Sequence, residues 1–202
     1  MANENPLIII IGPSGVGKDE LCNRAKKTFP ELGRVVTATT RKPRLGEVDG
    51  VNYHFMWWPL FLFRALFLGY FVEYQKIHGN WYGTPRAGLD RALAKGPVML
   101  QIDYRGAHKI WRAYPHATPI FIDVPEPSLE TLRKRLVKRD GESEAINTRL
   151  ETAKDEFKHK HEFPHRIVND VLDKADDELT EIIGLAVSPI TRLDQYSSLP
   201  SN

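Results

Sequence analysis

The chain has 202 residues, of which 42% are hydrophobic and 27% charged, and its formal net charge is +2. This length favours one compact domain that buries a core without staples, and the composition is typical of globular rather than disordered proteins. The small net charge excludes a general polyanion binder, so no nucleic-acid partner is expected. Because Cys22 is the only cysteine, no intrachain disulfide can form, and we expect a reducing, cytoplasmic location.

No segment predicts an export signal or a membrane span. The N-terminal apolar run, Leu7–Ile11, has five residues and no basic flank. The apolar stretch from Met56 to Val72 contains Pro59 and Arg64 and is shorter than the ~18 residues of a membrane helix. We therefore expect no membrane partner.

The first half of the chain predicts one βα unit followed by an insertion. The β-branched run at 7–11 is typical of a strand buried on both faces of a parallel sheet. After a Gly-rich turn and a helix, the character changes at residue 39 to short strand-like pieces around one helix. The expected strands are 7–11, 35–39, 51–56, 70–76 and 80–83, and the expected helices are 18–28, 59–68 and 85–94.

Regular alternation resumes in the second half. Leu129, Leu132 and Leu136 have the i, i+3, i+7 spacing of an amphipathic helix that starts near Pro127. After a break at 140–141, a second helix carries Ile146, Leu150, Ala153 and Phe157 on one stripe. The other expected elements are strands 98–102, 119–124 and 166–168 and helices 105–113 and 173–185. This order predicts an α/β fold, a parallel sheet flanked by helices on both faces, with 187–202 as a loose tail.

A phosphate-binding motif follows the first strand and opens the first helix. It matches G-x-x-x-x-G-K at every fixed position, which predicts a P-loop NTPase-type sheet. The alternative is a chance Gly-rich turn, which the buried strand before it and the amphipathic helix after it disfavour. The residues expected to bind ATP phosphates are Gly12, Pro13, Ser14, Gly15, Val16, Gly17, Lys18 and Asp19.

Asp19 departs from this motif, which normally ends in a Ser or Thr that ligates Mg²⁺. A carboxylate is also a good oxygen ligand for Mg²⁺, and the first turn of a helix tolerates its charge. It also adds negative charge close to the triphosphate. We expect Asp19 to hold the metal, with an altered geometry and rate.

Two later segments resemble the nucleoside-monophosphate-binding region of guanylate kinases. They are residues 37–55 and residues 73–86, and the resemblance extends over roughly 7–185. It implies a single domain over 1–202, with a core at about 5–36 and 86–186, a mixed α+β GMP-binding insertion at about 37–85 and a short helical lid at about 136–150. It also implies ATP as co-substrate with Mg²⁺.

The expected GMP-binding residues fall in these segments, except Asp103. Two guanidiniums and two phenols suit one monophosphate dianion, whereas two arginines beside a proline can also form a solvated turn. A carboxylate accepts both donors of a guanine edge, N1–H and N2–H₂, and so disfavours adenine; a solvent-facing strand glutamate is the alternative. The phosphate set is Arg41, Arg44, Tyr53 and Tyr82; the guanine set is Glu73, Thr37 and Thr84; the resemblance adds Glu47 and Asp103.

The resemblance also implies a cationic lid. Phosphoryl transfer spreads negative charge over the moving group, and Arg139 and Arg149 are the residues expected to neutralise it, together with Lys18 and Arg41. Asn169 matches the segment that lines the adenine side. The chain departs from the family at Gln101, where an acidic residue is usual.

The helix expected over 59–68 is apolar nearly all round. Either it is buried, or it exposes a patch used for self-association, and we favour a homodimer through residues 57–68.

The predicted function is transfer of a phosphoryl group from ATP to GMP, and to dGMP, in purine nucleotide metabolism. Two alternatives stay open: a kinase similar to the ribose 1,5-bisphosphate phosphokinases, which share the Lys-Asp ending, and a non-catalytic guanylate-kinase-like binding module.

Overall fold

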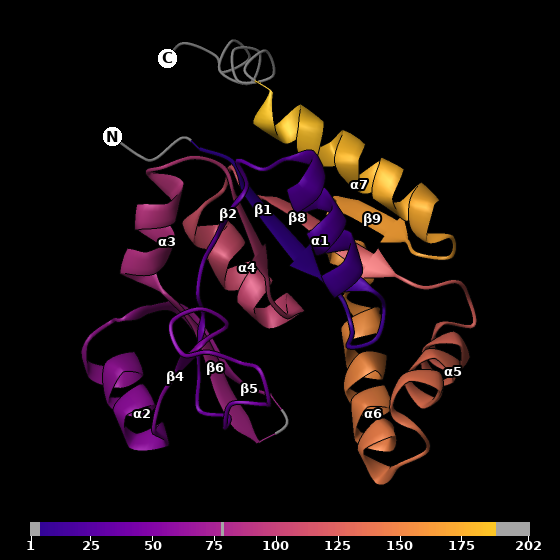
Figure 1. The fold of residues 1–202 in the computed structure, drawn as a ribbon, viewed down its shortest axis with the longest axis horizontal. Helices are drawn as coiled ribbons and strands as arrows, with labels where there is room; N and C mark the ends of the chain where they lie inside the picture. Colours follow the sequence, from indigo (N-terminus) through magenta and orange to yellow (C-terminus); the bar gives the residue numbers. More distant parts are fainter. Residues whose placement is uncertain (1–4, 78, 189–202) are drawn as a thin grey trace. The chain divides into compact units, whose positions relative to one another are not determined.

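The computed structural model describes residues 5–77 and 79–188 (Figure 1). By their internal contacts they divide into two compact units. Unit 1 takes Met1–Ile9 and Leu32–Ala117, and unit 2 takes Ile10–Glu31 and Thr118–Asn202. Each unit is described by itself below.

Unit 1 contains one end of a parallel sheet. Its strand order is β2 (Gly33–Arg34), β7 (Val98–Gln101) and then β1 (Leu7–Ile11), and β2 pairs with β7 in parallel. All five β1 side chains are buried, as expected for an apolar run in a parallel sheet whose two faces are both covered. Helices α3 (Arg86–Leu93) and α4 (Tyr104–Ala113) frame β7 in the sequence.

A second sheet of unit 1 has the strand order β4-β3-β6-β5. The strands are β3 (Ala38–Thr39), β4 (His54–Phe55), β5 (Phe71–Ile77) and β6 (Asn80–Pro85), and α2 (Trp58–Phe67) lies in the segment between β4 and β5 (Figure 1). Phe61 of α2 is fully buried and stacks on Phe71 at 4.5 Å between ring centroids. This small aromatic core attaches the helix to the sheet.

A β-bulge at Val72 decides which side chains of β5 face the core. Phe71 pairs with Pro85 and Glu73 with Thr84, so two steps on β5 match one step on β6. Side chains alternate along a strand, but the extra residue reverses the alternation. Phe71 therefore packs in the apolar core, whereas Glu73 points to the opposite face of the hairpin.

Unit 2 contains the other end of the parallel sheet. Its strand order is β1, β8 (Thr118–Asp123) and β9 (His165–Val168), and β8 pairs with β9 in parallel. Helix α1 (Lys18–Thr28) packs against α7 (Leu172–Val187), and Arg24 of α1 donates to Asp173 of α7 at 2.7 Å. Cys22 is buried in α1, as expected for a small apolar residue.

Two further helices of unit 2, α5 (Ser128–Asp140) and α6 (Glu144–Lys158), lie side by side, and a short 3₁₀ helix, Lys160–Glu162, follows (Figure 1). The predicted stripes supply their buried residues: Leu132, Leu136 and Ile146 are fully buried. Leu129 was expected on the same stripe, but it is 37% exposed because it lies in the first turn of α5.

The predicted α/β class with a parallel sheet flanked by helices is confirmed, but two strand predictions are wrong. The run 35–39 predicts one strand, yet β2 ends at Arg34 and β3 starts at Ala38 in a different sheet. The run 51–56 forms a turn and only a two-residue strand, β4. The division into core, insertion and lid remains a prediction, and residues 189–202 of the expected tail lie outside the described residues.

Among the described residues, no helix has the length and apolar character needed to cross a membrane. Helix α2 is nevertheless the most exposed apolar element, and the alternative that it is buried is wrong except for Phe61. Its exposed large side chains, with the two residues that flank it, are Trp57, Trp58, Leu60, Phe63, Leu66, Phe67 and Leu68.

Candidate active site

The Gly-rich turn of unit 2 forms the loop that the motif predicts. Gly12, Gly15 and Gly17 all have positive φ angles, which side chains rarely adopt, and Gly17 lies at the start of α1. A Cβ atom on Gly12 would lie 2.3 Å from the carbonyl oxygen of Ile122, and one on Gly17 would lie 2.3 Å from Asn169 Nδ2. The loop therefore needs glycine for both its conformation and its packing.

Lys18 lies at the first position of α1 and folds back over the loop. Its Nζ donates to the carbonyl oxygens of Gly12 and Pro13, the latter at 2.8 Å. Burial lowers the pKa of Lys18, and the charges of Glu156 and Asp19 oppose that shift. The ammonium group is thus held at the loop by carbonyl oxygens that a phosphate can replace as its partners.

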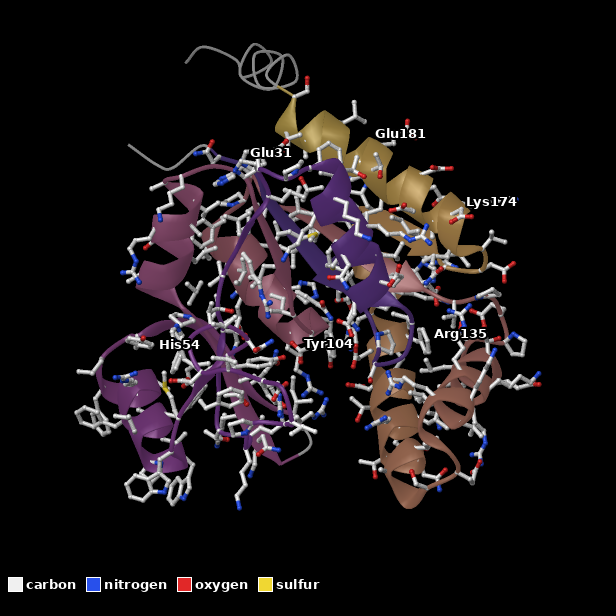
Figure 2. The ribbon with its side chains drawn as sticks, in the orientation of Figure 1. Glu31, His54, Tyr104, Arg135, Lys174 and Glu181 are labelled. Atoms are coloured by element: carbon white, nitrogen blue, oxygen red, sulfur yellow. The ribbon has the colours of Figure 1, made fainter. Side chains whose placement is uncertain are left out.

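Asn169 is hydrogen-bonded to the P-loop. Its side chain is 5% exposed, and Nδ2 donates to the carbonyl oxygen of Val16 at 2.8 Å. The backbone carbonyl oxygen of Asn169 accepts a hydrogen bond from the guanidinium of Arg135, which α5 carries (Figure 2), at 2.7 Å. Asn169 therefore links the P-loop to α5, a role that the sequence did not indicate; its predicted contact with adenine remains a prediction.

Three further predicted residues of unit 2 lie on helices α1, α5 and α6. Asp19 is exposed in the first turn of α1, with no helix residue before it except Lys18. Arg139 is exposed near the end of α5, and Arg149 is half-buried in α6. Arg133 contacts Asn147 of α6 and Glu142 in the connection between the two helices, so its guanidinium holds α5 and α6 together.

In unit 1, Arg41 is fixed by a carboxylate. Its two terminal nitrogens donate to the two carboxylate oxygens of Glu47 at 2.8 and 2.9 Å. The guanidinium also lies over the Tyr53 ring, 5.3 Å from its centroid. These hydrogen bonds raise the pKa of Arg41 and, with the backbone N–H of Arg44, lower the pKa of Glu47 to about 2. Glu47 therefore positions the arginine.

The other phosphate-set residues lie beside Arg41. The Tyr53 and Tyr82 rings meet edge to face with centroids 6.1 Å apart, and Tyr82 is also close enough to Arg41 to raise its pKa. Arg44 is exposed in the adjoining loop, and its backbone N–H donates to Glu47 at 2.7 Å. The structure thus brings the Arg41 guanidinium together with two phenols, and it joins Arg44 to Glu47 through the backbone; that this set binds a phosphate stays a prediction.

Glu73 is a buried acid, and the alternative that it is a solvent-facing strand residue is wrong. It is 4% exposed, and its Oε1 accepts from the hydroxyl of Thr84, directly opposite on β6, at 2.6 Å. Burial raises the pKa of Glu73 to about 7. Thr37 is half-buried at the strand edge beside β3, where its carbonyl oxygen accepts from His54.

Asp103 approaches the same hairpin from the start of α4. It caps this helix by accepting from the N–H of Gly106 at 2.9 Å, and burial raises its pKa. The side-chain amide of Gln75 donates to the same carboxylate oxygen. A Cβ on Gly106 would lie 2.9 Å from Glu73 Oε2, so only glycine lets the helix come this close.

Sequence reasoning missed Gln75, Gly106 and Glu156. Gln75 follows Glu73 by two residues, and this period-2 spacing could have placed both on one strand face. The spacing of Asp103 and Gly106 is typical of a helix cap, but nothing in the sequence indicates that Gly106 lies next to Glu73. Glu156 is 8% exposed in α6, and its charge acts on Lys18.

The fold and these residues define an α/β nucleotide-binding protein of the P-loop class. A backbone loop with a lysine lies in unit 2, and arginines, phenols and buried acids lie in unit 1.

Comparisons with known proteins identify the family within that class. A family model described as guanylate kinase matches residues 4–185, so the chain belongs to the guanylate kinase family. A guanylate kinase from Prochlorococcus marinus is 40% identical over 185 residues, covering 91% of this chain and 99% of that protein. One from Rubrobacter xylanophilus is 42% identical over 179 residues, covering 88% and 92%.

Solved structures agree. The crystal structure of guanylate kinase from Anaplasma phagocytophilum is similar with a TM-score of 0.71 and 26% identity, covering 98% of this chain and 97% of that chain. A gluconokinase from Sinorhizobium meliloti, with a TM-score of 0.51 and 14% identity, shares the fold alone. The family expected from the sequence is therefore confirmed.

Proposed function

We propose that this protein is a guanylate kinase that transfers the γ-phosphoryl group of ATP to GMP, and to dGMP, in purine nucleotide metabolism. The observation that carries the proposal is the buried Glu73 carboxylate beside Thr84, on the same face of the β5–β6 hairpin as Tyr82. The carboxylate complements the donor edge of a guanine, and the hydroxyl, which donates to that carboxylate, holds it in position.

The transfer is direct. An oxygen of the GMP phosphate forms a bond to the γ-phosphorus while the bond from that phosphorus to the β,γ-bridging oxygen breaks, leaving ADP and GDP. No protein nucleophile takes part. Arg41, Arg44 and the two phenols hold the acceptor phosphate, and Lys18 with the loop N–H groups holds the donor phosphates. Arg139 and Arg149 neutralise charge that develops on the moving group.

The residues present fit a Mg²⁺ ion held mostly by the triphosphate. Within the described part of the chain, no cluster of three or more acidic, histidine or cysteine side chains is arranged to hold a metal. Mg²⁺ typically uses one or two carboxylates together with phosphates and water, and exposed Asp19 in the first turn of α1 supplies one. When bound, the ion offsets phosphate charge.

A coupled ADP-release assay with GMP, dGMP, AMP, IMP and ribose 1,5-bisphosphate tests the proposal. We expect turnover with GMP far above AMP. Turnover with the sugar bisphosphate alone would favour the first alternative, and no turnover with any acceptor would favour the non-catalytic module. The match to the family and its named relatives favours neither alternative.

We also propose that the protein forms a homodimer through residues 57–68. Four aromatic residues there are 51% to 74% exposed, namely Trp57, Trp58, Phe63 and Phe67. With the neighbouring leucines these side chains form one apolar patch, and exposed aromatic residues of this kind are typical of the centre of protein–protein interfaces. The single charged residue of the segment, Arg64, contacts Met56 and the Tyr70 ring. Because the exposed side chains of the patch are therefore apolar, the same patch of a second copy is a suitable partner.

Analytical ultracentrifugation tests this dimer. We expect a dimer at micromolar concentration that Phe67→Glu dissociates and that Leu185→Glu, an exposed leucine on α7, leaves intact. A monomer at all concentrations would overturn the proposal, and association with lipid vesicles instead would identify a different occupant of the patch.

The buried, unpaired Cys22 supports the cytoplasmic location expected from the sequence.

A further inference from the structure

Gln75 lies on the face of the β5–β6 hairpin that also carries Glu73, Thr84 and Tyr82. It pairs directly with Tyr82, just as Glu73 pairs with Thr84 two residues before it. Residues directly opposite each other share a face, and so do residues two apart on one strand. The four side chains therefore form one surface, with Gln75 between the buried acid and the end of the hairpin.

The orientation of the Gln75 amide is determined by its partner. A carboxylate only accepts hydrogen bonds, so the group that contacts Asp103 Oδ1 is the NH₂ of Gln75. Asp103 is itself held by the N–H of Gly106. The Gln75 carbonyl oxygen then points away from Asp103.

That carbonyl oxygen, Oε1, is buried and has no hydrogen-bond partner among the described residues. A buried acceptor without a donor is destabilising, and native proteins rarely leave one unmatched. An N–H group that arrives with a ligand would remove this cost. Helix α4 packs closely on the Gln75 side chain at Gly106, where an added Cβ would lie 3.0 Å from Gln75 Nε2.

The chemistry of the proposed substrate supplies such a donor. The carboxylate of Glu73 can accept N1–H and one hydrogen of the 2-amino group of guanine. The second amino hydrogen then needs another acceptor. We propose that Gln75 is a specificity-determining residue whose side-chain carbonyl accepts this second hydrogen, so that the pocket distinguishes GMP from IMP, which has no 2-amino group. This inference rests on the proposed function.

Steady-state kinetics and competition binding with GMP and IMP test it in the full chain. Gln75→Met keeps the length of the side chain and removes the acceptor. We expect kcat/KM for GMP to fall by ~10-fold and that for IMP to change by less than ~2-fold, since only GMP loses a hydrogen bond. Lys76→Met, on the opposite face of the same strand and exposed, is the matched control and should change neither.

Three results would overturn the inference. Equal losses for both nucleotides would mean that Gln75 only holds Asp103 in place, and no loss for GMP would mean that the carbonyl meets no donor. If Gln75→Met is unstable, the losses for GMP and IMP can be compared in Gln75→Ala instead. Binding affinities for the two nucleotides give a second measurement that does not depend on turnover. Wild-type protein that neither binds nor turns over GMP would instead refute the proposed function, and this inference with it.

Discussion

The P-loop of unit 2 and the hairpin of unit 1 offer different kinds of groups to the ligands that we propose for them. The loop presents backbone groups, and its glycines with positive φ have no room for side chains. The hairpin presents side chains that are fixed by one another: Arg41 by Glu47, Glu73 by Thr84 and Asp103 by Gly106. Backbone N–H groups suit any polyphosphate, whereas oriented side chains can distinguish one base from another. Changes in the loop should therefore affect rate, and changes in the hairpin should affect selectivity.

The largest effect expected is on the loop lysine. Lys18→Ala removes the cation that meets the donor phosphates, and we expect kcat to fall by ~10³-fold. The melting temperature should stay level or rise, because the buried ammonium is lost. Stopped assays with saturating ATP and GMP measure the rate. If kcat fell by less than tenfold, the backbone amides of the loop would be sufficient to bind the donor phosphates without the lysine.

The next effect concerns packing of the loop. Gly17→Ala places a Cβ 2.3 Å from Asn169 Nδ2 at a φ of +99°, and we expect the free energy of unfolding to fall by about 3 kcal/mol. Gly69→Ala has a positive φ and no atom within 4 Å of the added Cβ, so it should cost about 1 kcal/mol. Urea denaturation compares the two. Equal losses would mean that backbone strain alone, and not the contact with Asn169, requires glycine.

The hairpin should respond to pH through Glu73. Its pKa of about 7 is raised by burial, and guanine needs the ionised carboxylate, so kcat/KM for GMP should fall about tenfold per pH unit below 7. The sign for stability is opposite. Because the folded protein holds this proton more tightly than the unfolded chain, the stability from this group is full below the ordinary pKa of 4.5 and is lost as pH rises through 7.

Glu73→Gln separates the two effects. It should remove both pH dependences and should bind GMP weakly at every pH. A pH profile of kcat/KM that persists unchanged in this variant would assign the titration to another group.

The smallest effect expected is at Glu47. Glu47→Gln loosens Arg41 but also frees its charge for phosphate, so KM for GMP should rise by no more than about fivefold. The selectivity for GMP over IMP should not change, because Glu47 contacts the phosphate set only. Initial-rate kinetics with both nucleotides check this, and an altered ratio would contradict the separation of phosphate and base contacts.

Much of the fold and site follows from local sequence signals. The P-loop is predictable because each of its requirements, two glycines and a lysine between a strand and a helix, is adjacent in the sequence. The contact of Arg41 with Tyr53 is predictable because both residues fall in one short segment, whereas phosphate binding by this set stays a prediction.

What could not be predicted depends on pairing across the chain. The run 35–39 has one continuous pattern, but β2 of the first sheet ends just before it, at Arg34, and only Ala38 and Thr39 belong to a strand, in the second sheet. The burial of Glu73 depends on the approach of Gly106, which is 33 residues away and carries no side chain to mark its place. Gln75 was missed because a glutamine gives no charge signal, and only its contact with Asp103 shows where its carbonyl points.

The extra residue at Val72 lets a single strand contribute to both an aromatic core and the face that we propose to bind GMP. Removing one amino acid there would exchange the roles of every side chain on one side of the deletion. Gene variants with length changes at this point should therefore be selected against far more strongly than replacements of Val72 itself. For anyone redesigning the base preference of this enzyme, strand length must be conserved before any side chain is altered.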